Sequence, residues 1–282
     1  MMILPSLIDA IVDRALEEDL AGGDLTGQTC IEESATATAD AVCRKEVVAC
    51  GAEVFRRVFA RIDPRCVVDV LVADGTRASA RTTLWRVRGP ARAVLAGERT
   101  ALNLAQRMTG VATLTRKYVD ALPAGSSTRI TDTRKTTPGL RVLERYAVRM
   151  GGGHNHRNDL GSAVMIKDNH IVAAGGIAKA VARSRAYAPH TTRIEVEVDG
   201  LAQLEEAIAA GADIVLLDNF STEDCARAVE RCRTLATRPL LEASGGITLE
   251  RVTELAKVGV DVISVGALTH SAPAADIGLD FQ

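Results

Sequence analysis

The sequence predicts an α/β protein in which an N-terminal α+β domain precedes a barrel of alternating strands and helices. The chain has 282 residues, enough for two hydrophobic cores. Hydrophobic residues make up 47% of it and aromatic residues only 3%, so Ala, Val, Leu and Ile must fill the core, as is common where helices pack closely on a parallel sheet. From about residue 128 onward, short β-rich runs alternate with amphipathic stretches.

Six runs in the second half of the chain have the apolar composition of strands. They are residues 129–133, 163–169, 193–199, 212–219, 239–246 and 260–267. Helices are predicted between them at residues 139–150, 201–211, 221–236 and 248–259. Ser221 and Thr248 stand where helix N-caps belong, and Gly211 and Gly259 where helices end. Repeated βα units of this kind either open into a doubly wound sheet or close into a barrel.

Polar residues at the C-terminal ends of the predicted strands favour the barrel. They are Lys167, Asp168, Asn169, Glu197, Asp218, Asn219, Glu242, Ser244 and Gly266. A barrel gathers its site from many strands at this rim, whereas an open sheet concentrates its ligand groups in one crevice, usually with a Gly-rich first turn. The sequence contains no G-x-G-x-x-G motif.

The first part of the chain has a different pattern. Helices are predicted near residues 5–20, 50–62 and 91–109, and strands around 36–48 and 66–88. We therefore expect an N-terminal α+β sandwich domain at residues 1–109 and the barrel at 110–270. The tail at 271–282 is too short for another βα unit, so we expect it to return to the first domain.

Charge and cysteine content restrict the class of protein. With 34 basic and 36 acidic residues, the chain has no global field to attract nucleic acid or a membrane, so any anion site must be local. The six cysteines form no C-x-x-C pair and are expected to be reduced thiols in a cytoplasmic protein. The N-terminus lacks the apolar run of a signal peptide, and no segment approaches the length of a membrane span.

A series of basic residues gives the densest functional signal. It consists of Arg134, Lys135, His156, Arg157 and Lys167. A single basic residue is commonly a solvated surface charge. These cations, however, stand at predicted strand ends, and Lys167 ends an apolar run, where a charge costs desolvation unless an anion meets it. The series predicts a substrate with several negative charges.

Carboxylates form the second group of candidate site residues. Glu195 and Glu197 share a face of their strand because they are two residues apart, and Asp218 ends the next strand. Carboxylates among cations at strand ends suit Mg²⁺ binding or stabilisation of a developing positive charge. The alternative is a structural ion pair with a neighbouring lysine or arginine.

Glycines after the last two strands suggest a phosphate site. The sequence EASGG at 242–246 and SVGALTH at 264–270 lets backbone N–H groups approach an anion, although ordinary turns also use glycine here. Gly151–Gly153 is either a phosphate loop or a loop that follows a helix. His154 and His156 form an H-x-H pair with no third metal ligand in view.

Several longer motifs resemble the quinolinate phosphoribosyltransferase family. The string TRKTTPGLRVLERYAVRMGGGHNHRNDL is similar to the family signature, and MIKDNHI, EVEVD, LLDNF, LEASGGI and SVGALTHSA follow in family order. GDLT and GERTALNLAQRMTGVAT are similar too, so the resemblance covers nearly the whole chain. It implies an N-terminal α/β sandwich, an incomplete barrel of about seven strands, and a homodimer, or a higher assembly, with sites at the subunit interface.

The resemblance also implies roles for individual residues. Arg134, Lys135, His156, Arg157 and Lys167 would hold the quinolinate carboxylates and the pyrophosphate of 5-phosphoribosyl 1-pyrophosphate, with Arg99 reaching in from the neighbouring subunit. Glu197 and Asp218 would flank the ribose and bind Mg²⁺, and with Lys135 they are the expected catalytic residues. Ser244, Gly245, Gly246, Gly266 and His270 would take the 5′-phosphate.

Two alternatives remain at this stage. One is a related phosphoribosyltransferase of the kind encoded with molybdate transporters, against which the N-H-R sequence at 155–157 and the complete basic series argue. The other is a phosphate-binding barrel without catalysis, which would not need Glu197 and Asp218 beside the cations. The expected reaction transfers phosphoribose to quinolinate with decarboxylation, in the synthesis of NAD.

Overall fold

The computed structural model describes residues 3–282, and these form two compact units. The first unit comprises the chain up to Arg116, together with Lys135–Gly152 and Ala267–Gln282. The second unit comprises Lys117–Arg134 and Gly153–Gly266. This division follows compactness alone, and the expected boundaries after residues 109 and 270 stay a prediction.

A four-stranded antiparallel sheet forms the framework of the first unit. In spatial order it contains β12 (Ile277–Phe281), β1 (Thr36–Cys43), β5 (Thr83–Pro90) and β3 (Val67–Val70). A separate pair joins β2 (Val47–Val48) to β4 (Arg77–Ala78). The tail therefore supplies an edge strand, with Ala41 opposite Leu279. Trp85 of β5 is fully buried and lies 5.1 Å from the ring of Phe55.

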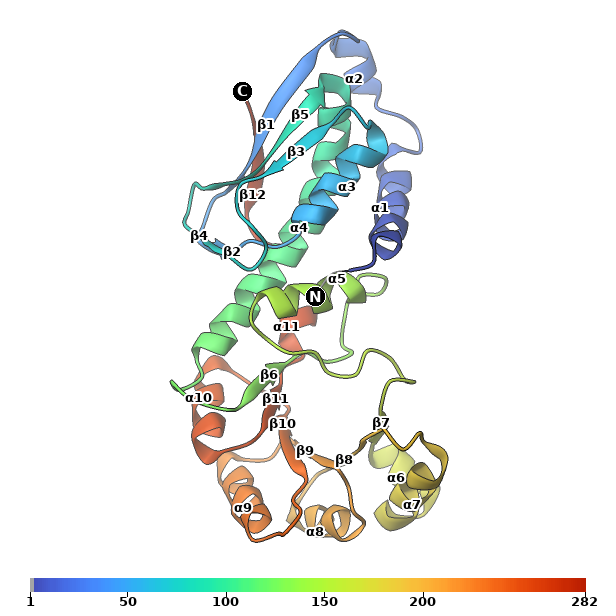
Figure 1. The fold of residues 1–282 in the computed structure, drawn as a ribbon, viewed down its shortest axis with the longest axis vertical. Helices are drawn as coiled ribbons and strands as arrows, with labels where there is room; N and C mark the ends of the chain where they lie inside the picture. Colours follow the sequence, from blue (N-terminus) through green and yellow to red (C-terminus); the bar gives the residue numbers. More distant parts are fainter. Residues whose placement is uncertain (1–2) are drawn as a thin grey trace. The chain divides into compact units, whose positions relative to one another are not determined.

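Helices complete the first unit, and some of them lie along this sheet in Figure 1. They are α1 (Pro5–Leu20), α2 (Leu25–Cys30), α3 (Ala52–Ile62), the first part of α4 (Ala91–Asp120), α5 (Arg141–Met150) and α11 (Ala267–His270). Helix α4 continues well past residue 109, where the sequence predicts its end. Gly110 lies inside this helix. The helix passes so close to the chain at Pro273 that only a glycine fits at this position.

The second unit is built on a parallel sheet. Its six strands run in the order β6 (Arg129–Thr131), β11 (Val262–Ser264), β10 (Leu240–Ser244), β9 (Ile214–Asp218), β8 (Ile194–Val198) and β7 (Val164–Ile166). Outside these six strands, the segment at His154 forms one isolated parallel bridge with Thr131 at the β6 edge. Within residues 3–282 no pairing joins this segment to β7, so the sheet stays open. The predicted α/β class with an incomplete barrel is confirmed.

Five helices of the described chain belong wholly to the second unit. They are α6 (Asp168–Ala174), α7 (Ile177–Tyr187), α8 (Leu201–Ala209), α9 (Thr222–Arg233) and α10 (Leu249–Val258). Ser221 Oγ accepts the backbone N–H of Asp224, and Thr248 Oγ1 that of Arg251, so both predicted N-caps are confirmed. Gly259 ends α10 in the left-handed conformation, as its position predicts.

The helix predicted at residues 139–150 forms as α5 but packs within the first unit, although the strands on either side of it in sequence belong to the second. Tyr146 donates its hydroxyl to Asp74 of the first unit at 2.9 Å. Among the described residues, all six cysteines are free thiols, and no helix combines the length and the apolar character needed to cross a membrane.

Candidate functional site

Glutamate side chains project from two strands of the second unit's sheet, β8 and β10, which are separated by β9. On β8, Glu195 and Glu197 alternate with the buried apolar residues Ile194, Val196 and Val198, so both carboxylates share the opposite face. In the register, Glu197 of β8 and Glu242 of β10 both lie opposite Leu216 of β9. The pairing thus brings carboxylates from separated parts of the sequence to one level of the sheet.

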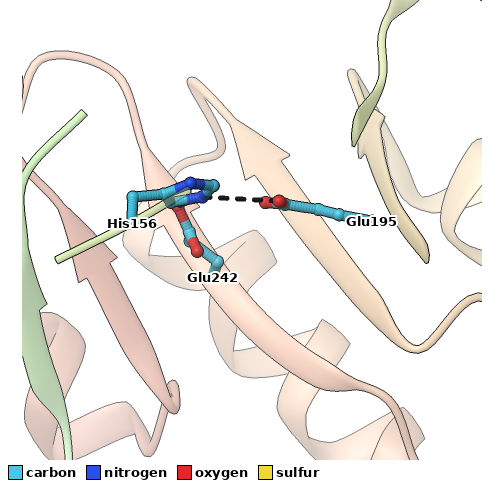
Figure 2. A group of neighbouring side chains, drawn as sticks. All are labelled: His156, Glu195 and Glu242. Atoms are coloured by element: carbon cyan, nitrogen blue, oxygen red, sulfur yellow. Dashed lines mark ion pairs between the residues drawn. The ribbon is translucent and has the colours of Figure 1, made fainter. Parts of the chain in front are cut away.

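Glu195 and Glu242 lie against the ring of His156 (Figure 2). The imidazole Nε2 is 3.3 Å from a carboxylate oxygen of each glutamate. The side chain of His156 is 12% exposed and those of the two glutamates 4%, so the group is almost removed from water. The other oxygen of Glu195, Oε1, is buried and has no hydrogen-bond partner among residues 3–282. A buried carboxylate pair of this kind needs a positive group, and His156 can supply it.

Burial alone would lower the pKa of His156, but the hydrogen bonds and charges of Glu195 and Glu242 outweigh it and raise the pKa to about 10. Burial is also the main cause that raises the pKa of Glu195. The backbone N–H of Arg157 lies 2.7 Å from Nδ1 and opposes protonation there. Two charge-assisted contacts are stronger than this one neutral hydrogen bond, so we assign the imidazolium form at neutral pH.

His156 is held in place by a buried carboxylate at the end of β6. Asp132 accepts the backbone N–H of His156 at 2.7 Å and the side-chain amide of Asn155 at 2.6 Å. Asp132 is fully buried. The segment after the His154 bridge is thereby fixed to the sheet, and the imidazole is directed towards the two glutamates.

Arg157 is half-buried and donates to the carbonyl of Ala163 at 3.2 Å. Burial lowers the pKa of its guanidinium, and the neighbouring charge of Arg134 lowers it further. Two arginine charges thus lie close enough in this unit to disfavour each other. An anion between or beside them would relieve the repulsion, as the basic series in the sequence suggests.

Lys167 forms an ion pair with Glu197 through its Nζ. Lys167 directly follows β7, and Glu197 lies near the end of the next strand, β8, so the contact joins neighbouring strand ends. The alternative interpretation from the sequence, a structural ion pair for Glu197, describes this contact.

The strand ends of β9 and β10 form a tight pair of turns. Asp218 and Ser244 are register partners, and the backbone N–H of Asn219 donates to the Ser244 carbonyl at 3.0 Å. Gly245 has a φ of +89°, and a Cβ there would lie 2.1 Å from Asn219 Oδ1. Glycine is needed on both counts. Asn219 in turn donates to Asp218 at 2.9 Å, which leaves that carboxylate half-exposed at the rim.

An arginine that the sequence reasoning missed holds these turns together. Arg251, from the first turn of α10, donates to the carbonyls of Gly245 and Phe220. Its sequence context is that of an ordinary helix surface residue, so no signal in the sequence indicates this role. The roles of Asp132 and Asn155 were also missed, because both depend on the pairing of His154 with β6.

The predicted site residues are divided between the two units. Arg134, His156, Arg157, Lys167, Glu197, Asp218, Ser244, Gly245, Gly246 and Gly266 belong to the second unit, and Arg99, Lys135 and His270 to the first. Arg99 and Lys135 are exposed. His270 Nδ1 lies 2.6 Å from the Ser271 hydroxyl. That all of these residues serve one site stays a prediction.

The side chains near the sheet differ in how well they suit a metal ion. Within residues 3–282, His156, Glu195 and Glu242 are the group of three close potential ligands. His156 is a poor ligand, because its Nε2 carries a hydrogen both in the imidazolium and in the neutral ring whose Nδ1 accepts an N–H. Asp218 offers half-exposed oxygen at the rim, which suits a hard cation that keeps other ligands.

Family descriptions match almost the whole chain. The description "Quinolinate phosphoribosyl transferase, N-terminal domain" matches residues 24–109, and "Quinolinate phosphoribosyl transferase, C-terminal domain" matches residues 111–280.

Individual relatives and solved structures are similar over the same length. The chain is 44% identical over 272 residues to the nicotinate-nucleotide pyrophosphorylase (carboxylating) of Mycobacterium leprae, covering 95% of each protein. It is 43% identical over 263 residues to the probable enzyme of that name from Bacillus subtilis, covering 93% of this chain and 89% of the relative. The structure of the nicotinate-nucleotide pyrophosphorylase from Francisella tularensis superposes with a TM-score of 0.93 at 40% identity, covering 100% of this chain and 98% of that one.

Proposed function

The chain belongs to the quinolinate phosphoribosyltransferase family, and on this premise we propose that it transfers phosphoribose from 5-phosphoribosyl 1-pyrophosphate to quinolinate. The products are nicotinate mononucleotide, CO₂ and pyrophosphate, so the enzyme serves the synthesis of NAD. One observation carries the proposal furthest: the imidazolium of His156 is held by two buried carboxylates, and the half-buried guanidinium of the next residue, Arg157, lies close to the charges of Arg134 and Glu195.

Quinolinate carries two carboxylates on neighbouring ring carbons, and the basic series provides their partners. Arg134 and Arg157 repel each other in the second unit, so an anion near them is stabilised by both. The imidazolium of His156 and the ammonium of Lys167 add charge at neighbouring strand ends. Both have carboxylate partners within the protein, which fix the direction of each side chain before substrate arrives.

Glu197 and Asp218 are assigned to the sugar. As the bond from C1 of the ribose to pyrophosphate breaks, positive charge develops on the ribose, and carboxylates at the strand ends of β8 and β9 stabilise it. The quinolinate nitrogen then forms its bond to C1. The resulting pyridinium accepts the electron pair left when the neighbouring carboxylate departs as CO₂, and a proton replaces it on the ring carbon. No nucleophile from the protein is required.

Asp218 and Glu197 would hold Mg²⁺, which when bound neutralises the pyrophosphate leaving group. Asp218 suits this role because its carboxylate is half-exposed and bound only through Asn219 among the contacts described above. Glu197 would contribute from its ion pair with Lys167. Substrate oxygens and water complete the coordination of such an ion in phosphate sites, so two protein carboxylates suffice.

The 5′-phosphate is assigned to the glycine turns. Ser244 ends β10, and Gly245 and Gly246 follow it with left-handed φ values of +89° and +56°. Successive backbone N–H groups in turns of this kind can form a concave site for an anion. Gly266 and His270 follow β11 in sequence and are assigned to the same phosphate. We further propose a homodimer in which Arg99 of one subunit serves the other, and a cytoplasmic location.

Turnover of quinolinate tests the proposal directly. Purified protein with quinolinate labelled in the 2-carboxylate, 5-phosphoribosyl 1-pyrophosphate and Mg²⁺ should release labelled CO₂ and form nicotinate mononucleotide in equal amounts. Transfer to another acceptor without CO₂ release would identify a phosphoribosyltransferase of different specificity. Binding of the donor without turnover of any acceptor would identify a phosphate-binding protein. Either result would refute the proposal.

A further inference from the structure

An ion pair in the first unit, whose carboxylate is buried and whose arginine is partly exposed, lies outside all of the residues assigned above. Arg107 of α4 donates to Glu144 of α5 from Nε at 3.0 Å and from a terminal nitrogen at 2.8 Å. Glu144 is fully buried. Its carboxylate also accepts the backbone N–H of Thr137 at 3.1 Å and the Thr137 hydroxyl at 2.7 Å. The pair therefore fixes the loop that follows Lys135.

The same arginine reaches the segment at residues 269–272. It donates to the carbonyl of Ala272 at 2.8 Å and to the carbonyl of Thr269. Thr269 is fully buried on α11, and its hydroxyl donates to the carbonyl of Lys135 at 2.8 Å. Thr269 is thus the residue at which Arg107, the short helix α11 and the backbone of Lys135 meet.

Removing the Glu144 carboxylate from water costs free energy, which its hydrogen bonds and its ion pair must offset. Its contacts with Arg107 and Thr137 also hold these partners in one geometry. The geometry fixed here is that of Lys135 relative to α11, which carries His270 next to Thr269. The family resemblance assigns Lys135 to the group of residues that hold the quinolinate carboxylates and the pyrophosphate, and the proposed function assigns His270 to the 5′-phosphate.

We propose that Thr269, held by Arg107 and Glu144, is a positioning residue that sets the spacing between Lys135 and His270 for the two ends of a ribose carrying a 5′-phosphate and a pyrophosphate. Thr269 contacts no reacting atom and acts through the backbone of Lys135. The inference rests on the proposed function, since the donor is the substrate whose phosphates the spacing fits.

The test compares Thr269→Val with Thr269→Ser. Valine keeps the shape and removes the hydroxyl, so the Lys135 carbonyl loses this donor inside the protein, whereas serine keeps the donor. We expect Thr269→Val to raise KM for 5-phosphoribosyl 1-pyrophosphate about tenfold, while the Kd of quinolinate changes by less than about threefold. Thr269→Ser should restore the wild-type KM. An unchanged KM in Thr269→Val, or no recovery in Thr269→Ser, overturns the proposal.

A matched control separates positioning from general loss of stability. Thr253 of α10 also donates its hydroxyl to a carbonyl, that of Ala121, at 2.8 Å, and serves none of the assigned roles. Thr253→Val should leave the KM for the donor unchanged. If it raises that KM as much as Thr269→Val does, the effect is one of stability and the positioning role is refuted.

Hydrogen exchange tests the positioning contact independently of the proposed reaction. In the substrate-free protein, amides of residues 133–140 should exchange faster in Thr269→Val than in the wild type or in Thr269→Ser. Faster exchange in a protein that releases no CO₂ would mean that the positioning contact exists and the proposed function is wrong. Equal exchange in all three proteins would overturn the positioning contact whatever the activity.

Discussion

Asp218 is the last residue of β9 and Glu197 the next to last of β8, but their surroundings differ. Asp218 is bound by the neutral amide of Asn219, whereas Glu197 is paired with the charged Lys167. A substitution at Asp218 removes one charge and leaves the side chains around it in place. The same change at Glu197 also releases the ammonium of Lys167.

This difference predicts distinct effects of two conservative changes. We expect Asp218→Asn to lower kcat about a hundredfold or more, as loss of one electrostatic stabiliser commonly does, with little change in quinolinate affinity. Glu197→Gln should lower kcat by a similar factor and also shift quinolinate affinity, because Lys167 loses its partner. Steady-state kinetics with parallel binding titrations measure both. A near-normal kcat in both variants would leave these carboxylates as structural partners only.

The charge on His156 predicts a pH dependence of stability. The pKa of the ring is about 10 in the folded protein and about 6.5 in the unfolded chain, so its contribution to stability is complete below about pH 6.5 and is lost as the pH rises towards 10. In Glu242→Gln one carboxylate partner is neutral, the folded pKa falls, and the loss occurs at lower pH. Urea unfolding across this range and the NMR titration of the ring report the two quantities.

A suitable control for this experiment is Glu230→Gln. Glu230 is an exposed carboxylate on α9 that pairs only with Arg233 among its described contacts. It should leave the pH profile unchanged. A wild-type ring that titrates near pH 6.5 would show that Nδ1 keeps the Arg157 N–H and that the carboxylates do not charge the ring.

Among the secondary-structure elements, α4 differs most from what the sequence predicts. The sequence predicts that this helix ends near residue 109, and Gly110 and the β-branched residues after it have low helix propensity. Packing overrides this local preference, since the helix continues to Asp120 and Tyr118 donates its hydroxyl to the carbonyl of Ile247. Local propensity could not predict that contact, because its partner lies far along the chain.

Gly110 gives a test of this close packing. Alanine at an ordinary helical position is more favourable than glycine by about 1 kcal/mol. At position 110, however, an added Cβ would lie 2.0 Å from the Pro273 carbonyl oxygen. We expect Gly110→Ala to lower the free energy of unfolding by about 1–3 kcal/mol. Gly22→Ala is the control, because nothing lies within 4 Å of a Cβ there. A stabilised Gly110→Ala protein would contradict the close approach.

The strands could be predicted well and the contacts across them could not. Each of the six predicted strand regions contains one of the strands β6 to β11, because short β-branched runs bounded by glycine and polar residues are a local signal. The approach of His156 to Glu195 and Glu242 depends on strand order and register, which no local pattern encodes. The Arg107–Glu144 pair was missed for the same reason, since each residue alone resembles a solvated helix charge.

At the scale of the whole molecule, the proposed homodimer predicts complementation between subunits. Arg99 is an exposed residue of α4, and the family resemblance assigns it to the partner's site. Chains carrying Arg99→Ala and chains carrying Lys135→Ala should each be inactive, while mixed dimers recover part of the activity, because one of the two sites is then intact. Verified heterodimers without recovery would show that Arg99 acts within its own chain.

The pairing of β12 with β1 also orders events during protein synthesis. Asp40 and Gln282 are in contact although 242 positions separate them in sequence. A ribosome that adds roughly 5–20 residues per second therefore needs on the order of 10–50 s between making β1 and making its edge partner. During that time the backbone N–H and C=O groups of β1 that later pair with β12 have no partner strand, and another extended chain could pair with them. The first unit thus begins to be translated before the second, but its sheet is complete only after β12 has been made.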